Sequence, residues 1–199
     1  MTHSLPHTAA LVCHSGTYSQ AVHGIEAHVW WTQSAALALT YILKGDLARL
    51  QIPPPGPPRR ADRLWQHTCF EAFISVKGEP AYYEFNFSPS GEWAAYAFRR
   101  YREGAPLADD ELAPMIKVRS AKKNLDLDVV INLDRLLKMS PRLQLRLGIS
   151  AVVEEKRGMR SYWAVKHPPG KPDFHHPDAF ALELEAPKSK ETRGLLEGD

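Results

Sequence analysis

Residues 64–100 constrain the fold more than any other segment, because they alternate like three consecutive β-strands joined by tight turns. Every second residue from Phe70 to Val76 is apolar, and the residues between them are Glu71, Phe73, Ser75 and Lys77. A period of two is the signature of a strand. Residues 82–87 and 93–98 repeat this behaviour, and turns containing Gly and Pro precede both. Gly and Pro supply the backbone angles that hairpins require. The segment therefore predicts an antiparallel meander.

The same alternation recurs along the chain, and no sustained helical periodicity interrupts it. Residues 134–137 suit one short helical turn, with Asp134 as its N-cap. We therefore expect an all-β fold of ten or eleven strands, a single antiparallel β-sandwich of the jelly-roll kind with one or two short helices. Further strands are predicted at residues 25–32, 35–43, 116–119, 125–133, 143–153, 160–165 and 179–184. The predicted core includes Phe70, Ala72, Ile74, Leu145 and Leu147.

The length of 199 residues suits one β-rich domain. We assign residues 1–186 to that domain and residues 187–199 to a polar C-terminal tail. Residues 53–60, with the sequence PPPGPPRR, form the clearest interruption. We interpret them as a stiff surface loop within the domain, with a domain boundary or a ligand for an aromatic groove as alternatives.

Charge and composition exclude several partners. The 25 basic and 23 acidic residues give a net charge of +2, so we expect neither nucleic acid nor a membrane surface as a partner. No apolar run is long enough to cross a bilayer, and the N-terminus lacks the features of a secretory signal. We therefore expect a cytoplasmic protein with reduced thiols at Cys13 and Cys69, the latter buried in its strand. The oligomeric state stays open.

Residues suited to ligand binding gather in two segments, 63–67 and 162–178. A sugar site needs a flat aromatic face for the ring C–H groups and planar polar side chains for the hydroxyls. Structural packing is the alternative role for Trp65 and Trp163. The candidate faces are Trp65, Trp163 and Phe174, and the candidate polar groups are Gln66, His67, Glu71, Asn86 and His167. We further expect Trp65, His67, Trp163, His167 and His175 to border one concave site.

Glu71 in its strand, the run from Tyr83 to Asn86 and the turn at Pro89–Gly91 together form a recognisable pattern. The pattern resembles the family-nine carbohydrate-binding modules and the related DOMON-type domains, which are β-sandwiches that hold a sugar or a haem. The resemblance is good over residues 65–91 and weak over the last hundred residues. It implies a sugar clamped between two tryptophans, here Trp65 and Trp163. It predicts a ligand-binding module for a sugar or a similar small hydroxylated molecule, without catalysis of its own and without a cofactor.

The haem-carrying relatives provide an alternative, in which haem b is held by Met and His or by Met and Lys. The four methionines lie away from the expected loops, which leaves His67 with His167 or His175 as axial ligands. A third hypothesis is a metal site in the segment 167–178, formed by His167, Asp173, His175, His176 and Asp178. We favour a structured turn for that segment, locked by His175 or His176, and expect no metal.

Enzyme motifs such as Gly-x-Ser-x-Gly, the Walker loop and His-Glu-x-x-His are missing from the sequence. Glu71 and Glu84 lie on successive predicted strands, where they would suit the carboxylate pair of a glycosidase. We expect both to face solvent, as most such residues on antiparallel strands do. A module that docks on another protein is the remaining alternative.

Overall fold

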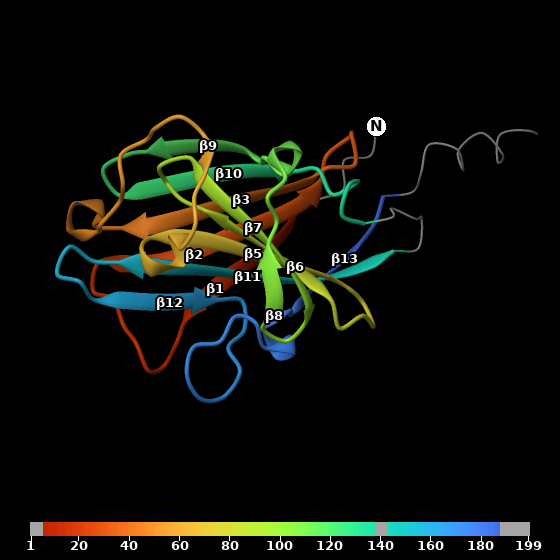
Figure 1. The fold of residues 1–199 in the computed structure, drawn as a ribbon. Helices are drawn as coiled ribbons and strands as arrows, with labels where there is room; N and C mark the ends of the chain where they lie inside the picture. Colours follow the sequence, from red (N-terminus) through yellow and green to blue (C-terminus); the bar gives the residue numbers. More distant parts are fainter. Residues whose placement is uncertain (1–5, 138–142, 188–199) are drawn as a thin grey trace, which may run out of the picture.

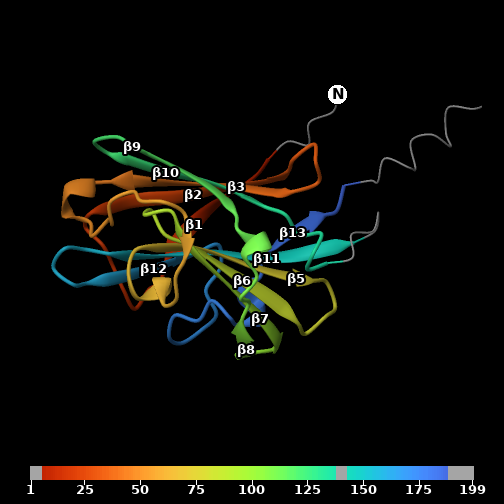
Figure 2. The same cartoon turned by 45° about the horizontal axis from the view of Figure 1, so that its top comes forward.

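The computed structural model describes residues 6–137 and 143–187, which form thirteen β-strands in two layers (Figures 1 and 2). Helical structure in this part of the chain is confined to four 3-10 turns of three residues each, which are η1 (Leu47–Arg49), η2 (Leu64–Gln66), η3 (Asp110–Leu112) and η4 (Pro177–Ala179). None of the helices in the described ranges could span a membrane. The strands are β1 (His7–Cys13), β2 (Val22–Trp31), β3 (Leu37–Gly45), β4 (Arg59–Arg60), β5 (Cys69–Val76), β6 (Tyr82–Phe87), β7 (Glu92–Arg100), β8 (Glu103–Pro106), β9 (Met115–Ser120), β10 (Asn124–Ile131), β11 (Gln144–Glu154), β12 (Arg160–Ala164) and β13 (Leu182–Glu185).

The two layers are joined by β1. The first sheet has the order β1-β2-β3-β10-β9, and the second runs β4-β7-β6-β5-β11-β12-β1. Strand β1 pairs with β2 at one end and with β12 at the other, so it contributes to both layers. Strands β8 and β13 extend the second sheet beside β7 and β11. The predicted sandwich is confirmed, with one exception to its antiparallel pairing, since β4 runs parallel to β7.

The core lies between the layers and follows the predicted alternation. All five residues predicted for it are buried there, and so is the row Leu37, Leu39, Tyr41 and Leu43 on β3. The meander is also confirmed as β5, β6 and β7, with Ala72 opposite Phe85 and Phe85 opposite Ala95. The inward rows of both sheets interdigitate in this way, as a sandwich requires.

Three short or irregular strands escaped prediction. Strand β1 is an apolar segment without alternation whose residues are mostly exposed, β4 has two residues, and β8 has four. The proline-rich segment packs as a loop of the same unit, where the Gly56 amide donates to the Ser90 carbonyl over 2.8 Å. Of the predicted C-terminal tail, all but Pro187 lies outside the described residues.

Strand β5 is covered on both faces. Phe70, Ala72 and Ile74 face the core, whereas Phe73 packs on the opposite face of the sheet. There it belongs to a second apolar group, called here the outer cluster, which comprises Phe73, Tyr82, Val152, Ala164, Phe174 and Phe180. The outer cluster shelters the outward face of the second sheet from water.

Tyr41 connects the two layers across the core. Its side chain is fully buried, and its hydroxyl donates to the backbone carbonyl of Glu71 over 2.8 Å. Its ring also packs on Phe70, with centroids 5.0 Å apart. The buried hydroxyl of β3 therefore fixes the position of β5 at Glu71.

We expect Tyr41→Phe to lower the free energy of unfolding by about 1–2 kcal/mol, because the Glu71 carbonyl loses a buried donor. Denaturant titration measures this change. Tyr18 is 60% exposed, so Tyr18→Phe serves as the control and should stay within about 0.5 kcal/mol of the wild type. Equal effects of the two substitutions would show that the hydroxyl of Tyr41 does not tie the layers together.

Candidate functional site

A pocket of about 350 Å³ opens on the outward face of the second sheet. Strands β5, β6, β7, β11 and β12 form its floor, and the segments around Trp65, Arg102 and Phe174 form its walls. It combines aromatic rings with acidic and basic groups, which is the usual composition of a binding pocket. The residues that line it are Trp65, Glu71, Phe73, Glu84, Tyr96, Phe98, Arg102, Val152, Arg160, Tyr162, Pro172, Phe174 and His175.

Trp65 provides an accessible aromatic surface at the mouth of the pocket. It lies in η2 (Leu64–Gln66), remains 40% exposed, and meets the ring of Tyr96 edge-on with centroids 5.7 Å apart. Arg63, which precedes the turn, has a left-handed backbone with φ of 62°. Such a conformation is costly for a residue other than glycine, and strained residues cluster at functional sites. The local backbone thus holds Trp65 at the mouth of the pocket with 40% of its surface exposed.

Two carboxyl groups lie at the floor of the pocket. Glu71 on β5 and Glu84 on β6 are 3% and 5% exposed. Glu71 Oε2 has a weak contact of 3.5 Å with the hydroxyl of Ser150, whereas Glu84 Oε1 accepts from the Asn86 amide over 2.7 Å. Asn86 is itself fully buried. The floor is therefore acidic and poorly solvated.

Burial changes the protonation of this pair. Desolvation, followed by the charge of Glu84, raises the pKa of Glu71 well above its ordinary value. Desolvation likewise raises the pKa of Glu84 to about 7, although the hydrogen bond from Asn86 and the charge of Arg102 oppose the change. Two carboxylates in one dry site repel each other. At neutral pH the pair therefore retains at least part of a proton.

A chain of polar contacts leads from the pocket wall toward Glu84. The Arg102 amide donates to the Tyr82 hydroxyl over 3.1 Å, and that hydroxyl lies 2.9 Å from His175 Nδ1. Since the hydroxyl can then donate to Nδ1, the ring proton belongs on Nε2, which lies 3.6 Å from Glu84 Oε2. Burial and the charge of Arg102 lower the pKa of His175 to about 4. His175 is thus a neutral donor toward the acidic floor.

The loop of residues 165–176 forms one wall and is tied to the turn between β7 and β8. The Asp173 carboxylate accepts from Arg102 over 2.8 Å and from the Tyr101 hydroxyl over 2.6 Å. Those two bonds, with the Arg102 charge, outweigh desolvation and lower the pKa of Asp173. Arg102 has a left-handed φ of 55°. Two of the three wall segments, those around Trp65 and Arg102, therefore contain an arginine with a left-handed backbone.

The structure brings four of the residues proposed from the sequence to this pocket, namely Trp65, Glu71, Phe174 and His175. Asn86 lies behind them and orients Glu84. Gln66 contributes its backbone carbonyl, which accepts from Arg160 over 3.3 Å, while its side chain stays on the exposed η2 turn.

Three proposed residues lie elsewhere, so the expected arrangement around one concave site is wrong in this respect. Trp163 is 8% exposed and belongs to the core, where its indole donates to the Ser161 hydroxyl over 2.9 Å. Its neighbour Tyr162 faces the pocket because successive strand residues point to opposite faces. His67 pairs with Glu154 over 2.7 Å, and His167 bonds the Val12 carbonyl over 2.8 Å.

The expectation that Glu71 and Glu84 face solvent is also wrong. They face outward from the sheet, but the outer cluster and the loop at Phe174 cover that face. One signal in the sequence points to this outcome, because Phe73 shares the face of Glu71 and indicates that this side is also buried. The sequence suggests Glu84 only as a carboxylate partner of Glu71. Pocket residues not identified from the sequence are Phe73, Tyr96, Phe98, Arg102, Val152, Arg160, Tyr162 and Pro172.

The residues present do not fit haem. Of the three histidines considered as axial ligands, only His175 lines the pocket, and both of its nitrogens face other groups. Met115 and Met159 are exposed and lie outside it. Within the described ranges no cluster of three or more His, Cys, Asp or Glu could hold a metal ion. The turn interpretation of the segment 167–178 is confirmed for His176, whose Nδ1 accepts from the Asp178 amide over 3.2 Å.

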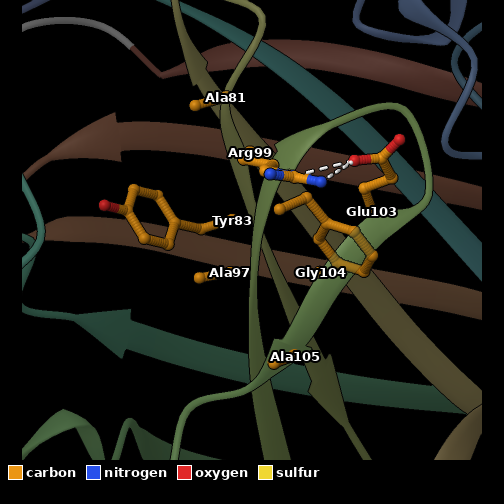
Figure 3. A pocket seen from close by; sticks show the side chains of 8 residues that line it. Ala81, Tyr83, Ala97, Arg99, Glu103, Gly104 and Ala105 are labelled. Carbon is orange, nitrogen blue, oxygen red and sulfur yellow. Dashed lines mark hydrogen bonds and ion pairs between the residues drawn. The ribbon is translucent and has the colours of Figure 1, made fainter.

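A second hollow, of about 680 Å³, lies beside β6, β7 and β8 (Figure 3). It is open to solvent and is lined mainly by small side chains, including Ala81, Ala97 and Ala105. Its charged groups, Arg99 and Glu103, already form an ion pair of 2.7 Å. This hollow offers no unpaired polar group for a ligand, so the smaller pocket is the better candidate.

Comparisons with known proteins identify the fold. No protein-family model matches the sequence, and no curated protein matches it. A proposed carbohydrate-binding protein from Bacteroides uniformis is 16% identical, with a TM-score of 0.63 over 87% of this chain and 83% of that one.

Two structures of a family-nine carbohydrate-binding module from Caldicellulosiruptor kristjanssonii share the fold as well, each at 12% identity. The complex with cellotriose gives a TM-score of 0.59 over 94% of this chain and 85% of the module. The complex with glucose gives a TM-score of 0.52 over 88% of this chain and 81% of the module. The expected likeness to family-nine modules is thus supported at the level of the fold, while the link to DOMON-type domains stays a prediction.

The pKa of Glu84 predicts a pH dependence of stability. Between the unfolded value of 4.5 and the folded value of about 7, the folded protein binds more protons than the unfolded chain, so this group destabilises the fold as the pH rises. Glu84→Gln removes the effect. We expect the free energy of unfolding of the variant, relative to wild type, to increase by roughly 3 kcal/mol from pH 4.5 to pH 7.

Denaturant titrations at several pH values measure this difference. The pKa of His175 is lowered from 6.5 to about 4, so this residue makes the fold more stable as the pH rises through that range. The pH dependence of wild-type stability alone would therefore hide the contribution of Glu84. Glu183→Gln is the control, because Glu183 is an exposed partner of Lys77. If the difference in the free energy of unfolding between Glu84→Gln and the wild type stays constant with pH, the raised pKa of Glu84 is contradicted.

Proposed function

We propose that this protein is a non-catalytic carbohydrate-binding module and that its ligand occupies the pocket beside Trp65. The observation that carries the proposal is the combination of a half-exposed indole with buried polar groups in one concavity. An exposed aromatic face suits the C–H groups of a sugar ring. Glu71, Glu84 and His175 below it, with Arg160 at the rim, suit the hydroxyl groups.

The shared fold supports this proposal. The cellotriose and glucose complexes show that modules of this architecture bind sugars, although fold alone does not transfer a function. The pocket adds an argument from this chain's own residues. It is a concave hollow of a size that suits a small molecule, which favours a small ligand over docking on another protein.

The placement of the two carboxyl groups supports binding without hydrolysis. The two carboxyl groups of a glycosidase flank the scissile bond. Here Glu71 and Glu84 lie on adjacent strands in the floor of the pocket, so both lie on the same side of a ligand. We therefore assign Glu71 and Glu84 to recognition of the ligand.

Calorimetric titration with monosaccharides and short oligosaccharides tests the proposal, with cellotriose and glucose as the first probes. We expect saturable binding of at least one sugar and no reducing-end product after prolonged incubation. A panel of sugars without any binding would refute carbohydrate recognition, and released product would refute the absence of catalysis.

Trp65→Ala should weaken sugar binding by about tenfold or more, because one aromatic contact contributes on the order of 1.4 kcal/mol. Since the indole is partly exposed, the free energy of unfolding should change by less than about 1 kcal/mol. Trp163→Ala is the matched comparison and should cost roughly 3–5 kcal/mol, because that indole packs in the core. A comparable loss of stability in Trp65→Ala would make Trp65 a packing residue.

A further inference from the structure

The floor of the pocket contains two acids without a matching cation. Glu71 and Glu84 lie on adjacent strands, where Glu71 is opposite Asn86 and Glu84 is opposite Phe73. This register makes the two glutamates diagonal neighbours on one face of the sheet. Both are more than nine-tenths buried, and buried charges are normally paired.

Of the two buried carboxyl groups, that of Glu71 is the less satisfied. Its Oε2 has only the contact of 3.5 Å with the Ser150 hydroxyl, and among the described residues no hydrogen bond reaches its Oε1, whereas Glu84 accepts the 2.7 Å bond from Asn86. A buried carboxyl that lines a cavity and lacks a strong donor is prepared to receive one from a ligand.

The positive groups nearby do not neutralise this floor. Arg102 is held by Asp173 and by the Tyr101 hydroxyl, and Arg160 lies exposed at the mouth, where it donates to the Gln66 carbonyl. His175 is neutral at physiological pH. The cationic groups therefore belong to the rim, whereas the base of the pocket offers two acceptors.

Aromatic rings surround the same space. Phe73, Tyr96, Phe98 and Tyr162 line the pocket together with Trp65. Aromatic faces attract a cation electrostatically, and aromatic cages are a recurrent way to bind ammonium groups. Acidic side chains beneath such rings add hydrogen-bond acceptors and charge, so both features favour the same kind of ligand.

We propose that the pocket selects sugars that carry a primary ammonium group, which would lie between the carboxyl groups of Glu71 and Glu84. This assignment rests on the proposed function and narrows its ligand class to amino sugars.

Loss of the shared proton accompanies binding, because an ammonium group favours the ionised form of both carboxyls. The groups that face the pair during this change are Ser150 on β11, Asn86 and Tyr82 on β6, Tyr96 on β7, and His175, Arg102 and Asp173 from the walls.

Three β-1,4-linked trisaccharides of equal length test the assignment by calorimetry at about pH 6, where the amines of the deacetylated trimer are ammonium groups and do not take up the proton that the carboxyl pair loses. Cellotriose carries a hydroxyl at C2, chitotriose an acetamide, and fully deacetylated chitotriose an ammonium group. We expect the deacetylated trimer to bind about tenfold more tightly than cellotriose, as suits hydrogen bonds to a charged group. It should also release protons, measured as a dependence of the heat on the ionisation enthalpy of the buffer.

Glu71→Gln and Glu84→Gln provide the second measurement. Each substitution should reduce the ratio of the affinity for the deacetylated trimer to the affinity for cellotriose toward one. Glu183→Gln on the exposed surface should leave that ratio at its wild-type value. Thermal melting establishes that each variant is folded, and two separate positions guard against the failure of one.

The outcomes separate this inference from the proposed function. Binding of cellotriose or acetylated chitotriose equal to or tighter than that of the deacetylated trimer overturns ammonium selectivity and leaves carbohydrate binding intact. A preference that survives both glutamine substitutions also overturns the assignment. Absence of binding by all three sugars, together with the wider panel, refutes the proposed function itself.

Discussion

The pocket depends on the burial of β5 on both of its faces. Tyr41 ties the strand to the opposite layer through the Glu71 carbonyl, and the outer cluster covers the other side. Water is therefore scarce around Glu71 and Glu84, which raises their pKa values and strengthens every polar contact that a ligand makes there. A sheet with a solvated outward face would have left two ordinary surface carboxylates at these positions.

Alternation along the chain predicted the architecture well because burial of one strand face imposes a period of two. The rows Phe70–Ile74 and Leu37–Leu43 occupy the core as this rule requires. Strands β1, β4 and β8 could not be recognised in the same way, since β1 shows no alternation, β4 and β8 are short, and all three are held by pairing with neighbours. Pairing between distant segments leaves little trace in a local pattern.

The candidate site was harder to predict because its residues converge through strand order. Trp65 and Glu71 are six residues apart in one segment, so their proximity follows from the sequence alone. Arg102, Arg160 and Tyr162 reach the pocket from turns and strands that only the folded order brings together. Trp163 and Tyr162 illustrate the difficulty, since the choice of inward face decides which of two adjacent aromatic residues can meet a ligand.

The shared strand β1 has a consequence for the solubility of the protein. Because residues 7–11 of β1 pair with β2 and residues 12 and 13 pair with β12, the two sheets are joined on that side. The open ends of the strand path are β9, which carries Lys117 and Arg119, and the two-residue β4, which follows a run of prolines. Charged, very short and proline-flanked edges resist pairing with other chains. The fold thereby protects a strand-rich molecule from edge-to-edge aggregation.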